Sequence, residues 1–317
     1  MRKLAKVLMW LLITILLGIG LYTLWCLVAY RDIDTADLLE HYGEGVQFTE
    51  IGGTTLAYRI DGDLQSGPPW VLVHSHYFDS LMWDDMLDEL GTDAPVIRYD
   101  MTSHGLSGPD KKADYSMARD VDLLAGLLDQ LAVNSALVVG SSLGGNIAFN
   151  FAAAYPERTR ALVLINSGGM KRQQSSRRNA SGIAPWFYRV FYFVPTAAYR
   201  AFIEWMVVDD AVATDALVQR FHHMFRHSGN RQAEMQRMAS FDTGEPAPVL
   251  AKVTAPSLIL WGKQNPQLPF ELADEFVSLL GNAASVEKIV VDGAGHLLPV
   301  EKPAETAALL NQFRSGL

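Results

Sequence analysis

The sequence predicts an α/β fold, a mostly parallel eight-stranded sheet with helices on both faces, from two observations. Several short segments, such as 136–139 and 162–165, are continuous apolar runs, which are typical of strands buried on both faces. Segments with helical periodicity separate these runs, and such alternation favours a doubly wound sheet. The expected strands are 46–51, 55–60, 70–75, 95–100, 136–140, 161–166, 257–261 and 286–291.

Two of the intervening helices have recognisable ends. Ser116 is the expected N-cap of a helix with one apolar stripe, formed by Met117, Val121, Leu124, Leu128 and Leu131. A second helix is expected over 143–155, because Pro156 cannot continue it.

Residues 170–249 interrupt the alternation and predict a helical cap over the strand ends, inserted between core segments 46–169 and 250–317. They begin with a basic stretch, 171–178, and nine of the 22 residues 185–206 are aromatic. Such a cap suggests an apolar substrate pocket, although the same rings could simply pack the cap on the core.

The first thirty residues predict a transmembrane signal anchor. Residues 7–30 contain no charge over 24 positions. A helix of that length spans about 36 Å, which exceeds a hydrocarbon core of about 30 Å. A cleavable signal peptide is the alternative, but its apolar region is shorter, about 7–15 residues, and 27–29 match its cleavage pattern poorly.

The flanking charges predict the orientation of this anchor. Arg2, Lys3 and Lys6 precede the apolar run, whereas Arg31, Asp32, Asp34 and Asp37 follow it. Positive residues remain cytoplasmic, so a single-pass protein with an extracytoplasmic domain is expected, periplasmic in a Gram-negative cell. The polar residues 31–45 are interpreted as a tether.

Composition excludes several classes of protein. Of 317 residues, 49% are hydrophobic and 19% are charged, which excludes intrinsic disorder. A single cysteine, Cys26, excludes an internal disulfide and any multi-cysteine metal site. The net charge of −9 argues against nucleic acid as a partner. Residues 171–249 carry 10 basic and 7 acidic residues; this surplus could face anionic lipid, or belong to a solvated hinge.

The strongest chemical signal is the segment Gly140-Ser141-Ser142-Leu143-Gly144. It fits G-x-S-x-G between a buried strand and a helix, the context in which that motif presents a nucleophile. Only Ser142 has glycine at both required positions. The helix N-terminus beneath it favours developing negative charge. The alternative is a glycine-rich turn without chemistry.

A serine nucleophile needs a base, and His296 is the expected one. It follows the last strand in a glycine-containing loop, where the order serine, acid, histidine requires it. A lone histidine with only a structural role is the alternative reading.

With these motifs, residues 46–317 resemble the α/β-hydrolase superfamily. Segment 74–76 resembles its oxyanion loop, segment 98–107 its D-x-x-G-x-G-x-S loop, and Trp261-Gly262 and Gly295-His296 with Glu301 its C-terminal pattern. Residues 98–170 resemble membrane-anchored bacterial ester hydrolases. The resemblance implies the α/β-hydrolase fold and an oxyanion hole formed by the backbone N–H groups of His76 and Leu143. It implies no metal and no organic cofactor, and Ser142 excludes the branches with an aspartate nucleophile.

The chain departs from the family pattern at Ser75 and Ser103, which replace glycines, and at the catalytic acid. The family carries W-G-x-x-D after the seventh strand, where this chain has Asn265, and the other acid position is Asn166. An amide can orient an imidazole but cannot stabilise its charged form, and its NH2 group could select the wrong tautomer. Either catalysis is slow, or another carboxylate reaches His296; the candidates are Asp242, Glu245 and Asp292.

Other histidines give weaker signals. His223 and His227 stand four apart on an expected cap helix with His222 adjacent, but a packed or solvated face is favoured over a metal site. A zinc pair of His74 and His76 is less favoured still.

These observations predict a membrane-anchored serine hydrolase that cleaves small-molecule carboxylic esters, with apolar acyl groups, through a Ser-His acyl-enzyme mechanism. The lipid bilayer is its expected partner through residues 7–30. Two alternatives remain: a binding protein that kept the fold and lost the acid, and a C–C bond or lactone hydrolase using the same pair.

Overall fold

The strands lie in a single mixed sheet, seen in a computed structural model that describes residues 2–91, 94–170, 184, 186–240, 242 and 244–317. The basic stretch 171–178 lies outside these residues. The strand order is β1-β2-β4-β3-β5-β6-β7-β8. β2 is antiparallel to both of its neighbours, β1 and β4, and the other neighbouring strands are parallel. The strands are β1 (Gln47–Ile51), β2 (Thr54–Asp61), β3 (Trp70–Val73), β4 (Val96–Tyr99), β5 (Ala136–Ser141), β6 (Thr159–Ile165), β7 (Ser257–Gly262) and β8 (Val286–Val291).

All eight expected strands are present, within two residues of the expected bounds. The helices are α1 (Arg2–Ala29), α2 (Thr35–Tyr42), α3 (Asp84–Leu90), α4 (Met117–Gln130), α5 (Leu143–Ala154), α6 (Thr196–Met206), α7 (Asp215–Phe225), α8 (Asn230–Ser240), α9 (Pro246–Leu250), α10 (Leu272–Leu279), α11 (Leu298–Glu301) and α12 (Pro303–Ser315). Ser116 caps α4 as expected, with its hydroxyl accepting the Arg119 N–H.

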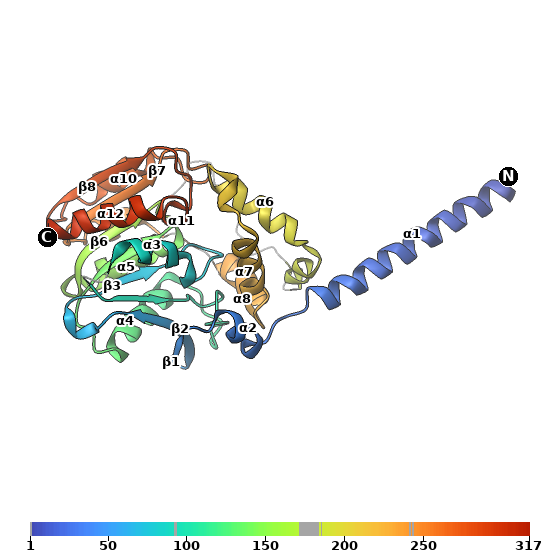
Figure 1. Ribbon diagram of the computed structural model, residues 1–317, viewed down its shortest axis with the longest axis horizontal. Helices are drawn as coiled ribbons and strands as arrows, with labels where there is room; N and C mark the ends of the chain where they lie inside the picture. The colour runs from blue at the N-terminus through green and yellow to red at the C-terminus, as the bar shows by residue number, and fades with distance from the viewer. Residues whose placement is uncertain (1, 92–93, 171–183, 185, 241, 243) are drawn as a thin grey trace.

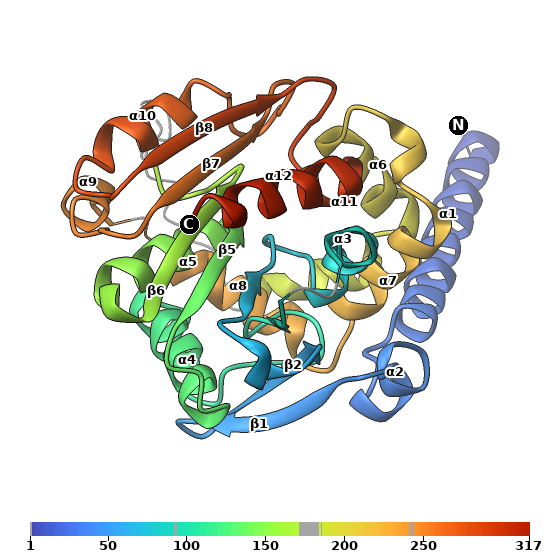
Figure 2. The same cartoon turned by 60° about the vertical axis from the view of Figure 1, so that its left-hand side comes forward.

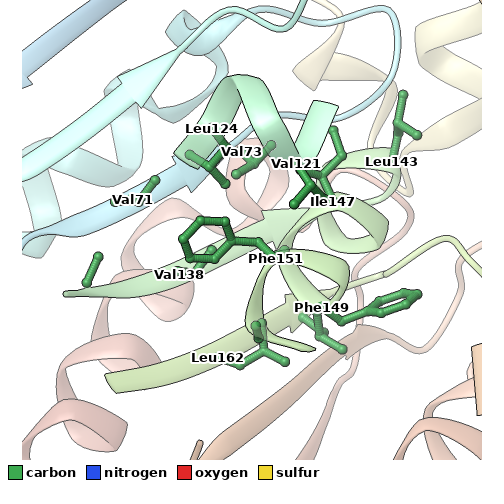
Figure 3. Packing of buried hydrophobic residues seen from close by; sticks show 14 of the residues in the cluster. Val71, Val73, Val121, Leu124, Val138, Leu143, Ile147, Phe149, Phe151 and Leu162 are labelled. Atoms are coloured by element: carbon green, nitrogen blue, oxygen red, sulfur yellow. The ribbon is translucent and has the colours of Figure 1, made fainter. Parts of the chain in front are cut away.

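Alternation along the central strands divides the core into two layers. Val71 and Val73 of β3 pack with helices α4, α5 and α10 on one face of the sheet, where Phe149 and Phe151 fill the space beneath α5 (Figure 3). Leu72, between them, packs with α3 and α12 on the other face, and Figure 2 shows α12 lying across that side. The sheet is therefore buried on both faces, as its continuous apolar runs predict.

The segment between β6 and β7 carries α6, α7, α8 and α9, together with the 3₁₀ helix η5 (Phe187–Phe193). In Figure 1 α6, α7 and α8 lie between the sheet and α1, whereas α9 lies beside α10 in Figure 2. Many of their rings pack on one another: Tyr199 contacts both Phe221 and Phe225, and Phe191 contacts Phe225. Much of the aromatic content therefore holds the cap together, while Trp186 and Trp205 remain 60% and 50% exposed.

The expectation of a tether over 31–45 is wrong, because most of that segment is a helix docked on the domain. Leu38 of α2 is 1% exposed, and its burial provides the docking energy that a polar reading of the segment overlooked. Ile33 exchanges backbone hydrogen bonds with Arg226 and Ser228 after α7. Arg59 donates to the carbonyl oxygens of Tyr42 and Glu44 at the end of α2.

Helix α1 projects away from the domain (Figure 1). Residues 3–29 have a mean hydropathy of 2.4 over their best window, of which 6% is buried, so by length and composition the helix could cross a membrane. A signal sequence at an N-terminus passes the same test.

Candidate active site

The chain turns sharply at Ser142, between β5 and α5, and this turn is called the elbow below. The serine has φ 53° and ψ −116°, a backbone conformation that residues other than glycine rarely adopt. A Cβ at Gly140 would lie 2.1 Å from the Gly144 carbonyl oxygen, and one at Gly144 would lie 2.2 Å from that of Val73. Both glycines of the motif are therefore required by close backbone contacts, which hold Ser142 at the tip of the turn.

His296 faces this serine from the loop after β8. Its Nε2 lies 3.0 Å from the Ser142 Oγ, a hydrogen-bond distance suited to a base and its nucleophile. His296 is buried, and its backbone N–H donates to the Met206 carbonyl oxygen at the end of α6, 2.7 Å away. Glu301 accepts the N–H groups of Gly295 and Leu297 on either side of the histidine. The cap and Glu301 together fix the position of the imidazole.

Asn265 contacts the imidazole of His296 at the nitrogen that does not face Ser142. Its Oδ1 lies 3.2 Å from Nδ1 of His296 and also accepts the backbone N–H groups of Gln267 and Leu268, each at 3.0 Å. Two backbone donors can bind only the amide oxygen, so they determine which way the amide points. Nδ1 of His296 must then carry the proton, and Nε2 is left free to act as base. This arrangement excludes the tautomer with the proton on Nε2, which the sequence left open.

No described carboxylate replaces the missing acid. Asp292 is exposed and bonds with Gln264 and Lys263, and Asp242 is exposed and accepts the Gly244 N–H. Glu245 is an exposed residue at the start of α9. Among the described residues, Nδ1 of His296 bonds with Asn265.

Asn166, at the other family position for the acid, has a structural role. Its amide donates to the carbonyl oxygens of Gly295 and His296 and accepts the Gly262 N–H. These bonds join the loops after β7 and β8, and so support the histidine loop from beneath.

Burial without a charged partner lowers the pKa of His296 to about 3. The imidazole must be neutral to act as base, so activity is present above this pKa and lost below it. We expect kcat/KM of the wild-type protein to stay level from neutral pH down to about pH 4, as long as the fold persists. In Asn265→Asp the added carboxylate raises the pKa of His296, which should move the acid limb of the profile upward. Equal acid limbs in the two proteins would contradict this assignment.

The proposed oxyanion donors lie beside the elbow. Leu143 opens α5, and the loop containing His76 passes close to it, because a Cβ at Gly144 would also lie 2.6 Å from the His74 carbonyl oxygen. Ser75 donates to the Ser141 Oγ at 2.8 Å, so the first departure from the family pattern ties this loop to the elbow.

A buried polar network lies behind this loop and was missed from the sequence. Glu234 and Arg237 of α8 are each 1% exposed. Arg237 binds Asp120 at 2.6 Å and donates to Ser103, and Glu234 lies 2.6 Å from the His76 Nε2. Ser103 is the second residue that departs from the family pattern. It has φ 67°, the left-handed backbone conformation that favours glycine, and it adds a hydroxyl group at this position. Charged residues on a surface helix ordinarily face solvent, so nothing in the sequence indicated that these two are buried.

His74, His223 and His227 hydrogen-bond to other parts of the protein. His223 bonds with Tyr42, and His227 bonds with Thr35 and with the Gly105 carbonyl oxygen, so the two do not converge on a common point. Nδ1 of His74 bonds with the Ser75 carbonyl oxygen, and its Nε2 accepts the Met101 N–H. His74 therefore has no nitrogen left for a metal.

A strand–helix elbow that presents a serine to a histidine after the last strand, on a sheet with an insertion after its sixth strand, defines the α/β-hydrolase class. The chain belongs to the alpha/beta hydrolase family, which it matches over residues 70–309. An uncharacterized protein of Mycobacterium bovis is 35% identical over 128 residues, 40% of this chain, which spans only 36% of that protein.

Two further proteins are similar over most of the chain. The 2-hydroxymuconate semialdehyde hydrolase of Pseudomonas sp. strain CF600 is 26% identical over 281 residues, 83% of this chain and 94% of that protein. The crystal structure of a membrane phospholipase A described as a bacterial virulence factor superposes with a TM-score of 0.72 at 22% identity, covering 97% of this chain and 98% of that one. At this identity the superposition shows the shared fold.

Proposed function

We propose that the protein is a serine hydrolase that cleaves carboxylic esters. The observation that carries the proposal is the row of contacts from Ser142 through His296 to Asn265, with separations of 3.0 and 3.2 Å. His296 removes the proton as Ser142 attacks the carbonyl, and then gives it to the leaving alcohol. Water, deprotonated by His296, then attacks the acyl group on Ser142 and releases the carboxylic acid. The backbone N–H groups of His76 and Leu143 bind the oxyanion.

An asparagine as third member is compatible with this chemistry. Cysteine proteases of the papain type use a Cys-His-Asn arrangement, in which the amide orients the imidazole. The missing charge lowers the rate of serine attack, since the imidazolium formed in the transition state is not stabilised. A binding protein without catalysis is the corresponding alternative, and the uncharged Asn265 is the observation that favours it.

A C–C bond or lactone hydrolase using the same pair is a further candidate, favoured by similarity to the 2-hydroxymuconate semialdehyde hydrolase. Likeness to the membrane phospholipase A favours the ester reading and an apolar acyl chain. Ester hydrolysis is preferred because the attacking serine, its base and the oxyanion donors are sufficient for it.

A fluorophosphonate probe tests the proposal directly, because it labels only a serine that has been activated as a nucleophile. We expect labelling of the full-length protein at Ser142, located by peptide mass spectrometry, and release of acid from short-chain aryl esters. Heat-denatured protein is the control for non-specific labelling. An unlabelled Ser142 together with no ester turnover would support the binding protein instead. Labelling of Ser142, together with turnover of a semialdehyde substrate in preference to esters, would support a C–C bond hydrolase instead.

We further propose that α1 anchors the domain in a lipid bilayer with the N-terminus in the cytoplasm. The exposed apolar side chains at the cap support this, since Trp186, Phe187 and Val190 are 60%, 40% and 40% exposed and η5 packs beside α1. Aromatic residues are favoured at the membrane–water interface. They would rest the cap on the same bilayer that holds the anchor.

Topology can be measured with a reporter that is active only outside the cytoplasm. Fused after Leu317, it should be active, and the mature protein should retain its N-terminal residues. The physical reason is the retention of Arg2, Lys3 and Lys6 on the cytoplasmic side. An inactive reporter, together with activity of a second reporter that works only in the cytoplasm, would overturn the orientation. A mature chain that begins near Arg31 would overturn the anchor.

A further inference from the structure

Three segments far apart in the sequence bring potential metal ligands to one point. His76 follows β3, His104 follows β4, and Glu234 lies on α8 of the cap. One ligand atom from each lies within 4.8 Å of the other two. Nε2 of His76 is 2.6 Å from one Glu234 oxygen, and Nε2 of His104 is 3.7 Å from the other. The carboxylate therefore lies between two imidazoles.

The contacts of His104 determine which of its nitrogens carries the proton. Nδ1 lies 3.0 Å from the Thr102 carbonyl oxygen, which can only accept a hydrogen bond. Nδ1 is therefore the donor, and Nε2 presents a lone pair. That Nε2 is buried and has no hydrogen-bond partner among the described residues, and it lies 3.7 Å from the second Glu234 oxygen. Two electron-pair donors thus face each other at 3.7 Å in the interior, which is unfavourable unless a cation binds both.

The charge of Glu234 is also incompletely balanced. Arg237, one turn away on α8, pairs with Asp120 at 2.6 and 3.1 Å and binds the Thr102 carbonyl oxygen with the same guanidinium group. Its remaining nitrogen donates to the Ser103 hydroxyl, which lies 3.3 Å from Glu234. The arginine therefore reaches the glutamate only through a hydroxyl group. The remaining close partner of this buried carboxylate among the described residues is the His76 imidazole at 2.6 Å, and a metal ion would replace the proton shared between the two groups.

We propose that His76, His104 and Glu234 form a binding site for a divalent transition metal ion, with zinc the best match. Two imidazole nitrogens and one carboxylate are a donor set that zinc takes with a fourth position open. Thr102 supplies the backbone carbonyl that orients a ligating histidine through its other nitrogen. The His76 side chain is 24% exposed, so the open position can be reached from solvent.

The bound ion would join the cap to the loop that carries the proposed oxyanion donor. Glu234 belongs to the cap, whereas His76 and His104 belong to loops of the core. The His76 ring stacks on Tyr77 with centroids 3.9 Å apart, so holding the ring also restrains the backbone on either side of it. The ion is thus a structural tie whose detection does not depend on ester hydrolysis.

The full-length protein in detergent, purified without a polyhistidine tag and dialysed against a chelator, is titrated with Co(II) and then with Zn(II). We expect one equivalent of Co(II) with the intense visible absorption of a four-coordinate site, bleached by Zn(II), and a rise in Tm with zinc. His76→Ala and Glu234→Gln should each weaken binding by about 100-fold or more, since even residues that only support metal ligands are worth about 10–100-fold. His41→Ala, which removes an exposed histidine elsewhere, is the matched control and should bind as wild type does.

Circular dichroism and Tm of the metal-free variants separate lost ligands from lost structure. The partly exposed His76 can be replaced without creating a buried cavity, and Glu234→Gln keeps the side-chain shape, so both variants are expected to fold. Absence of stoichiometric binding by the wild-type protein would overturn the proposal. So would unchanged affinity in His76→Ala and Glu234→Gln, or an equal loss in His41→Ala.

Discussion

Replacing Ser142 with alanine should lower kcat for ester hydrolysis by about 10⁶-fold, which corresponds to about 8 kcal/mol of transition-state stabilisation. The alanine leaves the elbow backbone intact but removes the oxygen that forms the acyl-enzyme. The remaining activity would come from the oxyanion donors acting on water. The measurement is kcat on a short-chain aryl ester together with fluorophosphonate labelling of the same preparation.

Ser141→Ala is the matched control for this experiment. Ser141 is the neighbouring residue, but its hydroxyl is buried and binds Ser75, so it faces the oxyanion loop instead of His296. We expect it to retain most of the labelling and much of the rate, with a modest cost from the lost hydrogen bond. Labelling that persists in Ser142→Ala and disappears in Ser141→Ala would move the nucleophile by one residue.

Asn265→Asp should raise kcat by up to about 10³–10⁴, the size of the loss that the reverse change causes in a protease triad. The site is prepared for a carboxylate. Gln267 and Leu268 already donate their N–H groups to Oδ1, while the Nδ2 of Asn265 is buried without a hydrogen-bond partner among the described residues. An aspartate would keep both donors, replace the unpaired nitrogen with oxygen, and stabilise the imidazolium of His296.

Three proteins are needed to interpret that measurement: wild type, Asn265→Asp and Asn265→Ala. A rise of at least about tenfold with aspartate, or about 1.4 kcal/mol of barrier, would identify Asn265 as a weakened third member. The alanine variant should be slower than wild type, because it leaves Nδ1 of His296 without an acceptor. Equal rates in all three would remove Asn265 from the mechanism and return attention to Asp242, Glu245 and Asp292.

Much of the fold was predictable because its determinants are local. Buried strands require continuous apolar runs, and the elbow requires glycines at 140 and 144, so both leave a pattern in the sequence. The segment over 31–45 was misread because its contacts are one fully buried leucine, Leu38, a few partly buried neighbours and the backbone hydrogen bonds of Ile33, and these form no pattern in the sequence.

The candidate site was predictable in part for the same reason. Ser142 and His296 each lie in a recognisable loop. The function of Asn265 depends on the two backbone N–H groups that orient its amide, and no composition or spacing encodes them. Likewise His76 and Glu234 are separated by 158 positions, and only the docking of α8 brings them together.

The hydrogen bond between the Met206 carbonyl oxygen and the His296 N–H connects the cap directly to the proposed base. A further bond joins Val208 to Glu301, and Gly295 lies so close to α6 that a Cβ there would be 2.5 Å from the same carbonyl. The C-terminal end of α6 is therefore fixed to the histidine loop, so a change in the position of residues 206–208 would also displace His296. Grafting the insertion of a relative onto this core would misalign the base unless residues 206–208 and Gly295 were transferred as a set.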